Sequence, residues 1–224
     1  WHEQIDAVKG SRLDAFLPLL GYEWGPHDLV RATTEAPWRS GSRVVLFAAD
    51  SVCDEYRVSA QRAQVNLVKG GAVYSPADGT VASSARGLYD ALETAAGRCG
   101  LEPHVSFATH GTREPSVDWS QPENQEDPLV ETMFEVYSER GFFECMDGGA
   151  AECGVDDADA LDGSFQAALS SGRRFGVLAS TDAHDGRPGS IADGPSFRWI
   201  YGDPTSPRQQ GYAGGLTGVF LAGE

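Results

Sequence analysis

The sequence predicts an α/β fold, and three observations support this class. Short apolar runs typical of β-strands alternate along the chain with segments of helical periodicity. Several runs are apolar almost throughout, as in strands that are buried on both faces of a sheet. Loops rich in Gly and Pro separate the elements. The chain has 224 residues, 41% of them apolar, so we expect one domain with a substantial core over residues 1–224.

Six apolar segments are predicted to be strands. Each combines branched or aromatic side chains with turn residues at its ends, a pattern that favours extended backbone. They are 16–24, 43–49, 104–109, 132–138, 175–180 and 216–222.

The clearest helix is predicted over residues 85–100. Leu88 and Leu92 share one face of this segment, and Gly100 is suited to end it as a C-cap residue. A shorter helix is expected over 164–172, between a Ser that can cap its start and a Gly that can stop it. A third is expected over 56–69, although its valines also suit a strand.

The chain is strongly acidic, with 17 Lys and Arg against 33 Asp and Glu and a net charge of −16. No cluster of basic residues stands out, so we expect no binding to nucleic acid. No apolar run approaches the roughly 20 residues that cross a bilayer, so we expect no membrane association. The acidity suits either a solvated surface or carboxylates gathered around bound cations.

The four cysteines are Cys53, Cys99, Cys145 and Cys153, and they lack the close paired spacing of a zinc ribbon or a redox motif. Cys145 and Cys153 flank the loop CMDGGAAEC, which a disulfide could close. Separate thiols are the alternative, so the cysteines do not decide between an oxidising and a reducing cellular compartment.

Candidate ligand side chains lie in or directly after four of the predicted strands. In barrels of parallel strands and in open α/β sheets, sites form at the carboxyl ends of strands, so we expect these side chains to converge. They are Glu23, His27, His110, Glu135, Asp182 and His184.

Each candidate also has an ordinary interpretation. A His after a strand is usually a loop residue, and Asp182 could cap a turn. Glu135 lies inside an apolar run, where a buried carboxylate needs a cation, a basic residue or protonation. Taken together, the six favour a metal site.

Imidazole nitrogens and carboxylate oxygens suit zinc, manganese or iron, and a carboxylate such as Glu23 could bridge two ions. Such ions lower the pKa of bound water and so provide a hydroxide nucleophile. The sequence contains no G-x-S-x-G, H-E-x-x-H, Gly-rich phosphate loop or G-x-G-x-x-G, which agrees with this chemistry.

Five motifs occur in the order GYEWGPHDLV, ATHGTREPSVDWS, FEVYSERGFFE, STDAHDGRPGS and GGLTGVFLA. In this order they resemble the PHP (polymerase and histidinol phosphatase) superfamily, and more closely its branch of PHP-like hydrolases. The match spans nearly the whole chain.

The resemblance implies a distorted, TIM-like, seven-stranded β/α barrel that holds two or three divalent ions, Zn, Mn or Fe. Glu23 would bridge ions, the other five candidates would complete the cluster, and Asp182 and His184 would take part in catalysis with Arg187. Arg187 would bind an anionic group of the substrate, with a surface salt bridge as its alternative. Trp24 and Trp119 would wall the site or anchor the core.

The sequence departs from the family pattern in two places. Family members begin with a strand that carries an H-x-H pair, and no H-x-H occurs here. We therefore expect a fragment of a longer protein that lacks the first strand and a final helix. Residues 30–82 also depart from the pattern.

The function predicted from these features is metal-dependent hydrolysis of a small anionic phosphoester, with amide or other ester hydrolysis as the variant. A non-catalytic metal-binding or ligand-binding module is the alternative class. A third reading is a structural acidic domain, in which Glu135 and Asp182 are solvated or paired with arginines such as Arg174. The sequence leaves the native metal and the oligomeric state open.

Overall fold

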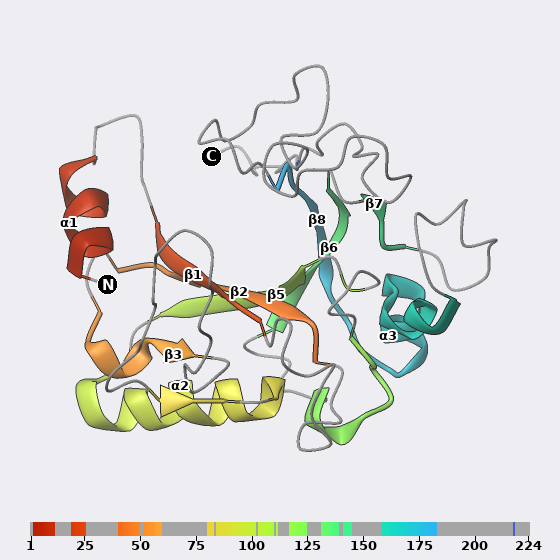
Figure 1. Cartoon of the computed structure of the whole chain (residues 1–224), viewed down its shortest axis with the longest axis horizontal. Coiled ribbons are helices and arrows are strands. Elements are labelled where there is room, and N and C mark those ends of the chain that lie inside the picture. The colour runs from red at the N-terminus through yellow and green to blue at the C-terminus, as the bar shows by residue number, and fades with distance from the viewer. Residues whose placement is uncertain are drawn as a thin grey trace, which may run out of the picture.

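The structure is a computed structural model, and it describes residues 2–11, 19–25, 40–49, 52–59, 80–82, 84–101, 103–109, 111, 117–124, 131–138, 141–144, 158–182 and 217. Figure 1 shows the arrangement of the elements. In chain order they are α1 (His2–Gly10), β1 (Leu20–Trp24), β2 (Ser42–Phe47), η1 (Asp54–Tyr56), β3 (Val58–Ser59), β4 (Thr80–Val81), α2 (Ala85–Cys99), β5 (His104–Thr109), η2 (Pro122–Asn124), β6 (Glu131–Ser138), β7 (Gly141–Phe142), η3 (Ala158–Gly163), α3 (Phe165–Ser170) and β8 (Gly176–Ala179).

The main sheet has six strands in the order β1-β2-β5-β6-β7, and β8 also pairs with β6. β2 runs antiparallel to β1 and β5, whereas β6 runs parallel to β5 and β8. Tyr137 pairs with both Phe142 of β7 and Ala179 of β8, so these two strands flank β6 on opposite sides. The strands β1, β5, β6 and β8 therefore all point in one direction.

The sheet is open, so the expectation of a seven-stranded, TIM-like barrel is wrong. A closed barrel would join its first and last strands, but within the described residues β1 pairs with β2 and β8 pairs with β6. The physical reason lies in β2, which inserts antiparallel between β1 and β5. A β/α barrel needs successive parallel strands joined by helices, and an antiparallel neighbour breaks that repeat.

Local predictions agree well with several elements. The strand predicted over 104–109 has the same bounds in the structure, and the helix predicted over 85–100 is α2. The side chain of Ser84 accepts a hydrogen bond from the Gly87 N–H at 3.2 Å and caps the start of α2. Gly100 follows the helix with φ of 94°, a conformation that Gly adopts without a steric cost.

Two other predictions have mixed outcomes. The helix predicted over 56–69 is wrong where it can be compared, because η1 and β3 occupy 54–59, and 60–69 lies outside the described residues. Of the strand predicted over 216–222, only Thr217 is described. Its hydroxyl accepts from the Ala179 N–H and donates to the Ala179 carbonyl, both at 2.8 Å.

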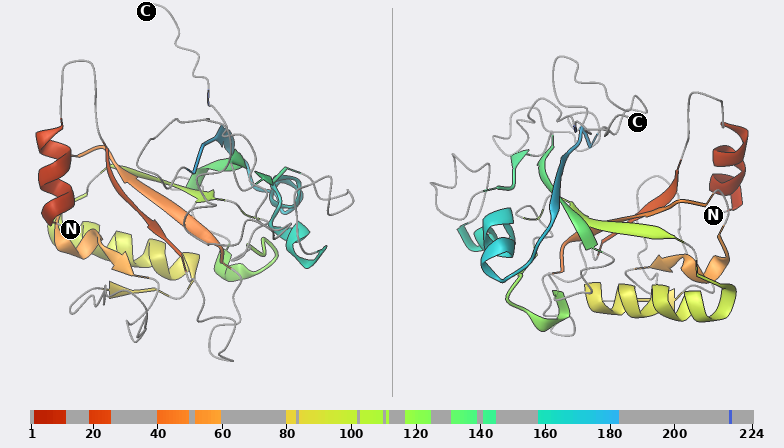
Figure 2. Two further views of the ribbon diagram at one scale, coloured as in Figure 1. Left: turned by 45° about the horizontal axis from the view of Figure 1, so that its top comes forward. Right: turned by 180° about the vertical axis from the view of Figure 1, so that it is seen from behind.

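One hydrophobic cluster lies between α2 and the sheet. Leu88 and Leu92 of α2 belong to the same buried cluster as Val45 and Phe47 of β2. The Tyr89 hydroxyl donates to Ser106 Oγ of β5 at 2.9 Å, which identifies the face of the sheet that α2 covers. Figure 2 shows α2 running across this face.

A second cluster lies around β6 and α3, and it is rich in aromatic rings. Trp119 and Phe134 pack with ring centroids 6.0 Å apart, and Phe165 of α3 and Phe175 pack against Phe134. Trp119 and Trp24 are each only 1% exposed. Both tryptophans are therefore anchors of the core. This was one of the two roles expected from the sequence, the other being to wall the site.

A disulfide between Cys53 and Cys99 ties the segment before η1 to the end of α2. The other two cysteines, Cys145 and Cys153, lie outside the described residues. No helix in the described part of the chain is long and apolar enough to cross a bilayer.

Candidate metal site at the carboxyl ends of the parallel strands

The neighbouring strands β5, β6 and β8 are parallel, so their carboxyl ends lie at the same edge of the sheet. Thr109 is the last residue of β5, and Glu135 of β6 lies opposite Leu178 of β8. Ligands of α/β proteins are bound at such an edge. If the predicted residues form a site, they should therefore lie at or near this edge of the sheet.

Glu135 is buried at this edge, with only 2% of its surface exposed. The hydroxyl of Ser180, the residue directly after β8, donates a hydrogen bond to Glu135 Oε1. The Ser180 N–H donates to the Tyr137 carbonyl at 3.0 Å, which keeps the chain beyond β8 alongside β6. Glu135 and Ser180 thus form a polar contact between β6 and the segment that follows β8.

Asp182 lies two residues beyond Ser180 and is half-buried. Its φ of 48° makes it the one non-glycine residue with positive φ in the described part of the chain. Asp tolerates this left-handed conformation better than most residues, and such backbone is frequent in functional sites. The turn begins directly after β8, near the end of β6.

Glu23 lies in β1, which is three strands away from β6. Its register partners across the sheet are Val44, then Phe107, then Met133. Three strand spacings of about 4.8 Å separate Glu23 from Met133 by about 14 Å. Glu135 is two residues further along β6, so it shares a face with Glu23 but is not its neighbour.

Four of the predicted site residues lie outside the described residues: His27, His110, His184 and Arg187. His110 directly follows the last residue of β5, and His184 follows Asp182 by two positions. Of the predicted metal ligands, the structure thus describes Glu23, Glu135 and Asp182. It places Glu135 within β6, three residues before that strand ends, and Asp182 three residues beyond the end of the neighbouring parallel strand β8.

The chemistry available at this edge is that of oxygen ligands. A buried carboxylate, a second carboxylate in a strained turn and a hydroxyl that orients the first carboxylate suit a divalent cation such as manganese or zinc.

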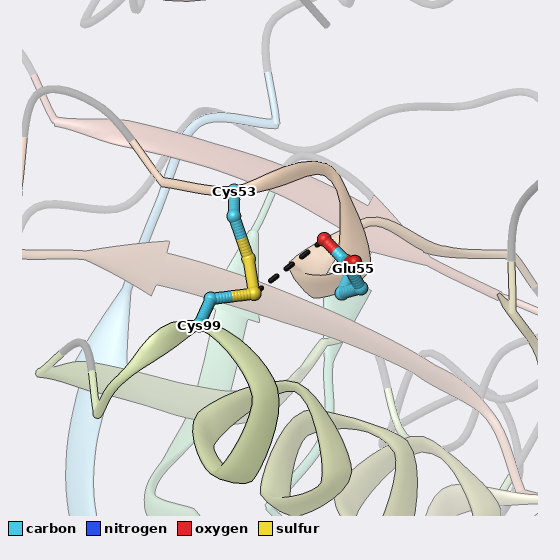
Figure 3. A group of neighbouring side chains, drawn as sticks. All are labelled: Cys53, Glu55 and Cys99. Carbon is cyan, nitrogen blue, oxygen red and sulfur yellow. Dashed lines mark hydrogen bonds between the residues drawn. A yellow bond between two sulfur atoms is a disulfide. The ribbon is translucent and has the colours of Figure 1, made fainter.

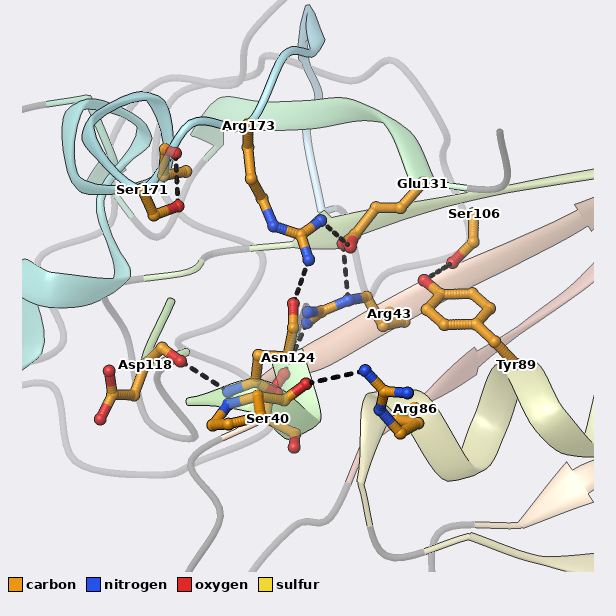
Figure 4. Close-up of polar contacts among 12 residues, drawn as sticks. Ser40, Arg43, Arg86, Tyr89, Ser106, Asp118, Asn124, Glu131, Ser171 and Arg173 are labelled. Carbon is orange, nitrogen blue, oxygen red and sulfur yellow. Dashed lines mark hydrogen bonds and ion pairs between the residues drawn. The ribbon is translucent and has the colours of Figure 1, made fainter. Parts of the chain in front are cut away.

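A second group of charged side chains, not anticipated from the sequence, lies at the opposite end of β6 (Figure 4). Glu131, the first residue of β6, is 1% exposed, and Arg43 of β2 is fully buried. Arg43 Nε lies 2.7 Å from Glu131 Oε1, and Arg173 Nη1 lies 3.4 Å from Glu131 Oε2. Arg43 also donates to the Ser40 carbonyl at 2.6 Å.

The two guanidinium groups also contact the ring of Trp119. Arg43 Cζ lies 5.4 Å and Arg173 Cζ 5.1 Å from the ring centroid, distances typical of cation–π contacts. Arg173 also donates to the Asn124 carbonyl. The group therefore joins β2, η2, β6 and the segment after α3 within the core, and its role is structural.

Sequence reasoning missed Ser180, Arg43 and Glu131. Ser180 stands in the quoted motif STDAHDGRPGS, but a Ser after a strand has no distinctive signal. Arg43 and Glu131 each stand immediately before an apolar run, where a charge at a strand start is easily taken for a solvated end. The opposite charges of Arg43 and Glu131 were the one feature of the sequence that pointed to this ion pair.

In comparisons with known proteins, no protein-family model matches the chain, and neither a curated protein nor a solved structure matches it significantly. The resemblance to the PHP superfamily accordingly stays a prediction from the motifs.

Proposed function

We propose that the chain is a metal-dependent hydrolase of a small phosphoester. The observation that carries the proposal is the hydrogen bond from Ser180, directly after β8, to Glu135 of the adjacent parallel strand β6, with Asp182 two residues further along the chain. We assign Glu135 and Asp182 as metal ligands, with His110 and His184 as the imidazole ligands suggested by their positions in the sequence.

The donor set fits a divalent Zn, Mn or Fe ion, because it combines carboxylate oxygens with imidazole nitrogens. The proposal is limited to an ion held by these four residues. Glu23 is left out of it, because the register places Glu23 three strands from Glu135. His27, four residues after Glu23 in the sequence, is left out with it.

Each residue has a specific task in this scheme. Ser180 donates to Glu135 Oε1 and thereby fixes the orientation of the carboxylate. Asp182 presents a second carboxylate from the turn after β8. A bound divalent ion lowers the pKa of coordinated water towards neutrality and so supplies the nucleophile. Arg187 binds the anionic group of the substrate through its forked donors.

Hydrolysis of an aryl phosphate in the presence of manganese tests the proposal. Asp182→Asn removes the charge and tolerates the positive φ, so the backbone of the turn is kept. We expect kcat/KM to fall by at least about 100-fold, more than is typical for residues outside the ligand set. Asp90→Asn, an exposed carboxylate on α2, is the matched control and should leave the rate unchanged.

Metal content separates the enzyme from the competing binding module. If the chain retains manganese through Glu135 and Asp182 but hydrolyses no phosphoester, amide or ester, the site is a metal-binding module. If Asp182→Asn and Asp90→Asn bind metal and turn over substrate as the unmodified chain does, the assigned site is wrong.

A further inference from the structure

A second candidate site lies at the end of α2, where Figure 3 shows Cys53, Glu55 and Cys99 side by side. The sulfur atoms of Cys53 and Cys99 and a carboxylate oxygen of Glu55 all lie within 4.8 Å of one another. Glu55 Oε2 is 3.4 Å from Cys99 Sγ. In the disulfide this is a contact only, but a Cys99 thiol could donate a hydrogen bond across the same distance.

The three side chains are reachable from solvent. Glu55 is exposed, and Cys53 and Cys99 are half-buried. A small reductant and an ion can therefore approach the sulfur atoms without unfolding the chain.

Contacts other than the disulfide hold the two segments together. Tyr56, next to Glu55, is fully buried, and its hydroxyl donates to the Gly100 carbonyl at 2.6 Å. The Tyr22 hydroxyl donates to the Tyr56 carbonyl at 2.9 Å. Burial raises the pKa of Tyr22, so this hydroxyl keeps its proton. The positions of Cys53, Glu55 and Cys99 are thus supported on both sides without the sulfur–sulfur bond.

The local electrostatics favour a cation. Cys99 is the last residue of α2, where the helix dipole places partial negative charge. Two thiolates and a carboxylate at this position form a donor set that zinc prefers.

We propose that reduction of the Cys53–Cys99 disulfide creates a zinc site from these two thiolates and the Glu55 carboxylate, with water in the fourth position. The reductant is a dithiol. Its two sulfur atoms become a disulfide, two electrons and two protons pass to Cys53 and Cys99, and Zn²⁺ then displaces the two thiol protons. Reoxidation reverses these steps and releases the ion.

The geometric change required is small. Zinc–sulfur bonds of about 2.3 Å in a tetrahedral site hold two sulfur atoms about 3.8 Å apart. Rotation of the two cysteine side chains can supply this separation while the hydrogen bonds from Tyr56 to Gly100 and from Tyr22 to Tyr56 stay in place. The site is separate from the one proposed at β6 and β8, and neither proposal depends on the other.

The test uses the full chain with Cys145→Ser and Cys153→Ser, so that Cys53 and Cys99 supply the only thiols. After reduction with a phosphine, which competes weakly for metal, the chain is titrated with cobalt(II). We expect a thiolate-to-cobalt charge-transfer band that saturates at one ion per chain and is abolished by zinc. The oxidised chain should give no such band.

Two variants sharpen the test. Glu55→Gln should weaken cobalt affinity by at least about tenfold, since a ligand is lost. Glu93→Gln, on the exposed side of α2, is the matched control and should bind as the parent does. Glu135→Gln should leave the charge-transfer band unchanged, which separates this site from the proposed hydrolase site.

Three outcomes would overturn the proposal. The reduced chain could give no charge-transfer band, Glu55→Gln could bind cobalt as tightly as the parent, or circular dichroism could show that reduction unfolds α2. The last result would mean that the contacts of Tyr56 do not hold the site together.

Discussion

Glu131 and Glu135 lie four residues apart on β6, and both are buried, yet their surroundings differ. Glu131 pairs with Arg43 and Arg173 in the core. Glu135 receives a hydrogen bond from the neutral hydroxyl of Ser180 at the edge where the parallel strands end.

A β-bulge separates the two environments. The register between β5 and β6 shifts after Ser106, which lies opposite Glu131, so that Phe107 lies opposite Met133. The extra residue turns Glu131 towards the face that α2 covers and Glu135 towards the other face. One strand thereby uses one glutamate to join the core and holds the other in the region where we propose the metal site.

The largest effect is expected from Glu131→Gln. The change leaves the buried guanidinium of Arg43 facing a neutral amide, and breaking a buried ion pair from one side costs about 3–5 kcal/mol of unfolding free energy. Urea unfolding measures the loss. Glu144→Gln, an exposed glutamate just after β7, is the control and should change stability by less than about 0.5 kcal/mol.

If Glu131→Gln lowers the free energy of unfolding by less than about 1 kcal/mol, then Glu131 contributes no more to stability than Glu135 does, and the comparison fails. Replacing both partners, Glu131→Gln with Arg43→Met, should recover part of the loss, because the uncompensated charge is then gone.

Glu135→Gln is expected to act on metal binding rather than on folding. Without metal, its stability should stay within about 1 kcal/mol of the unmodified chain, because the amide oxygen of Gln can still accept the hydrogen bond from Ser180. Manganese at about 100 times its dissociation constant should stabilise the unmodified oxidised chain by about 2.7 kcal/mol and the variant by clearly less. Thermal unfolding with and without manganese checks this, and equal stabilisation of both chains would remove Glu135 from the ligand set.

Ser180→Ala should give the smallest effect. The loss of one hydrogen bond to Glu135 should lower stability by about 1 kcal/mol and manganese affinity by about 10-fold to 100-fold. Ser171→Ala removes a comparable hydrogen bond, to the Ala168 carbonyl at 2.7 Å, outside the site. Calorimetric titration with manganese should show weaker binding in Ser180→Ala and no change in Ser171→Ala, whereas equal affinities would show that Ser180 does not orient a ligand.

The candidate site was predictable from the sequence only in part. Glu135 and Asp182 were singled out because a carboxylate inside an apolar run and a carboxylate after one are each unusual, and the structure places Glu135 in β6 and Asp182 shortly after the neighbouring strand β8. Ser180 was missed because its importance depends on Glu135, which is 45 residues away. The separation of Glu23 from Glu135 depends on the insertion of β2 between β1 and β5.

The sequence by itself determined the local elements, such as β5, α2 with its Gly100 end and α3 with its Ser164 cap, whose side chain accepts from the Ala167 N–H at 3.1 Å. These depend on periodicity and capping between residues a few positions apart. Only the tertiary structure decided the open sheet, the antiparallel β2, the Cys53–Cys99 disulfide and the Arg43–Glu131 pair. Each of these depends on which distant segments meet and in which direction they run, and such pairing leaves no periodic signal along the chain.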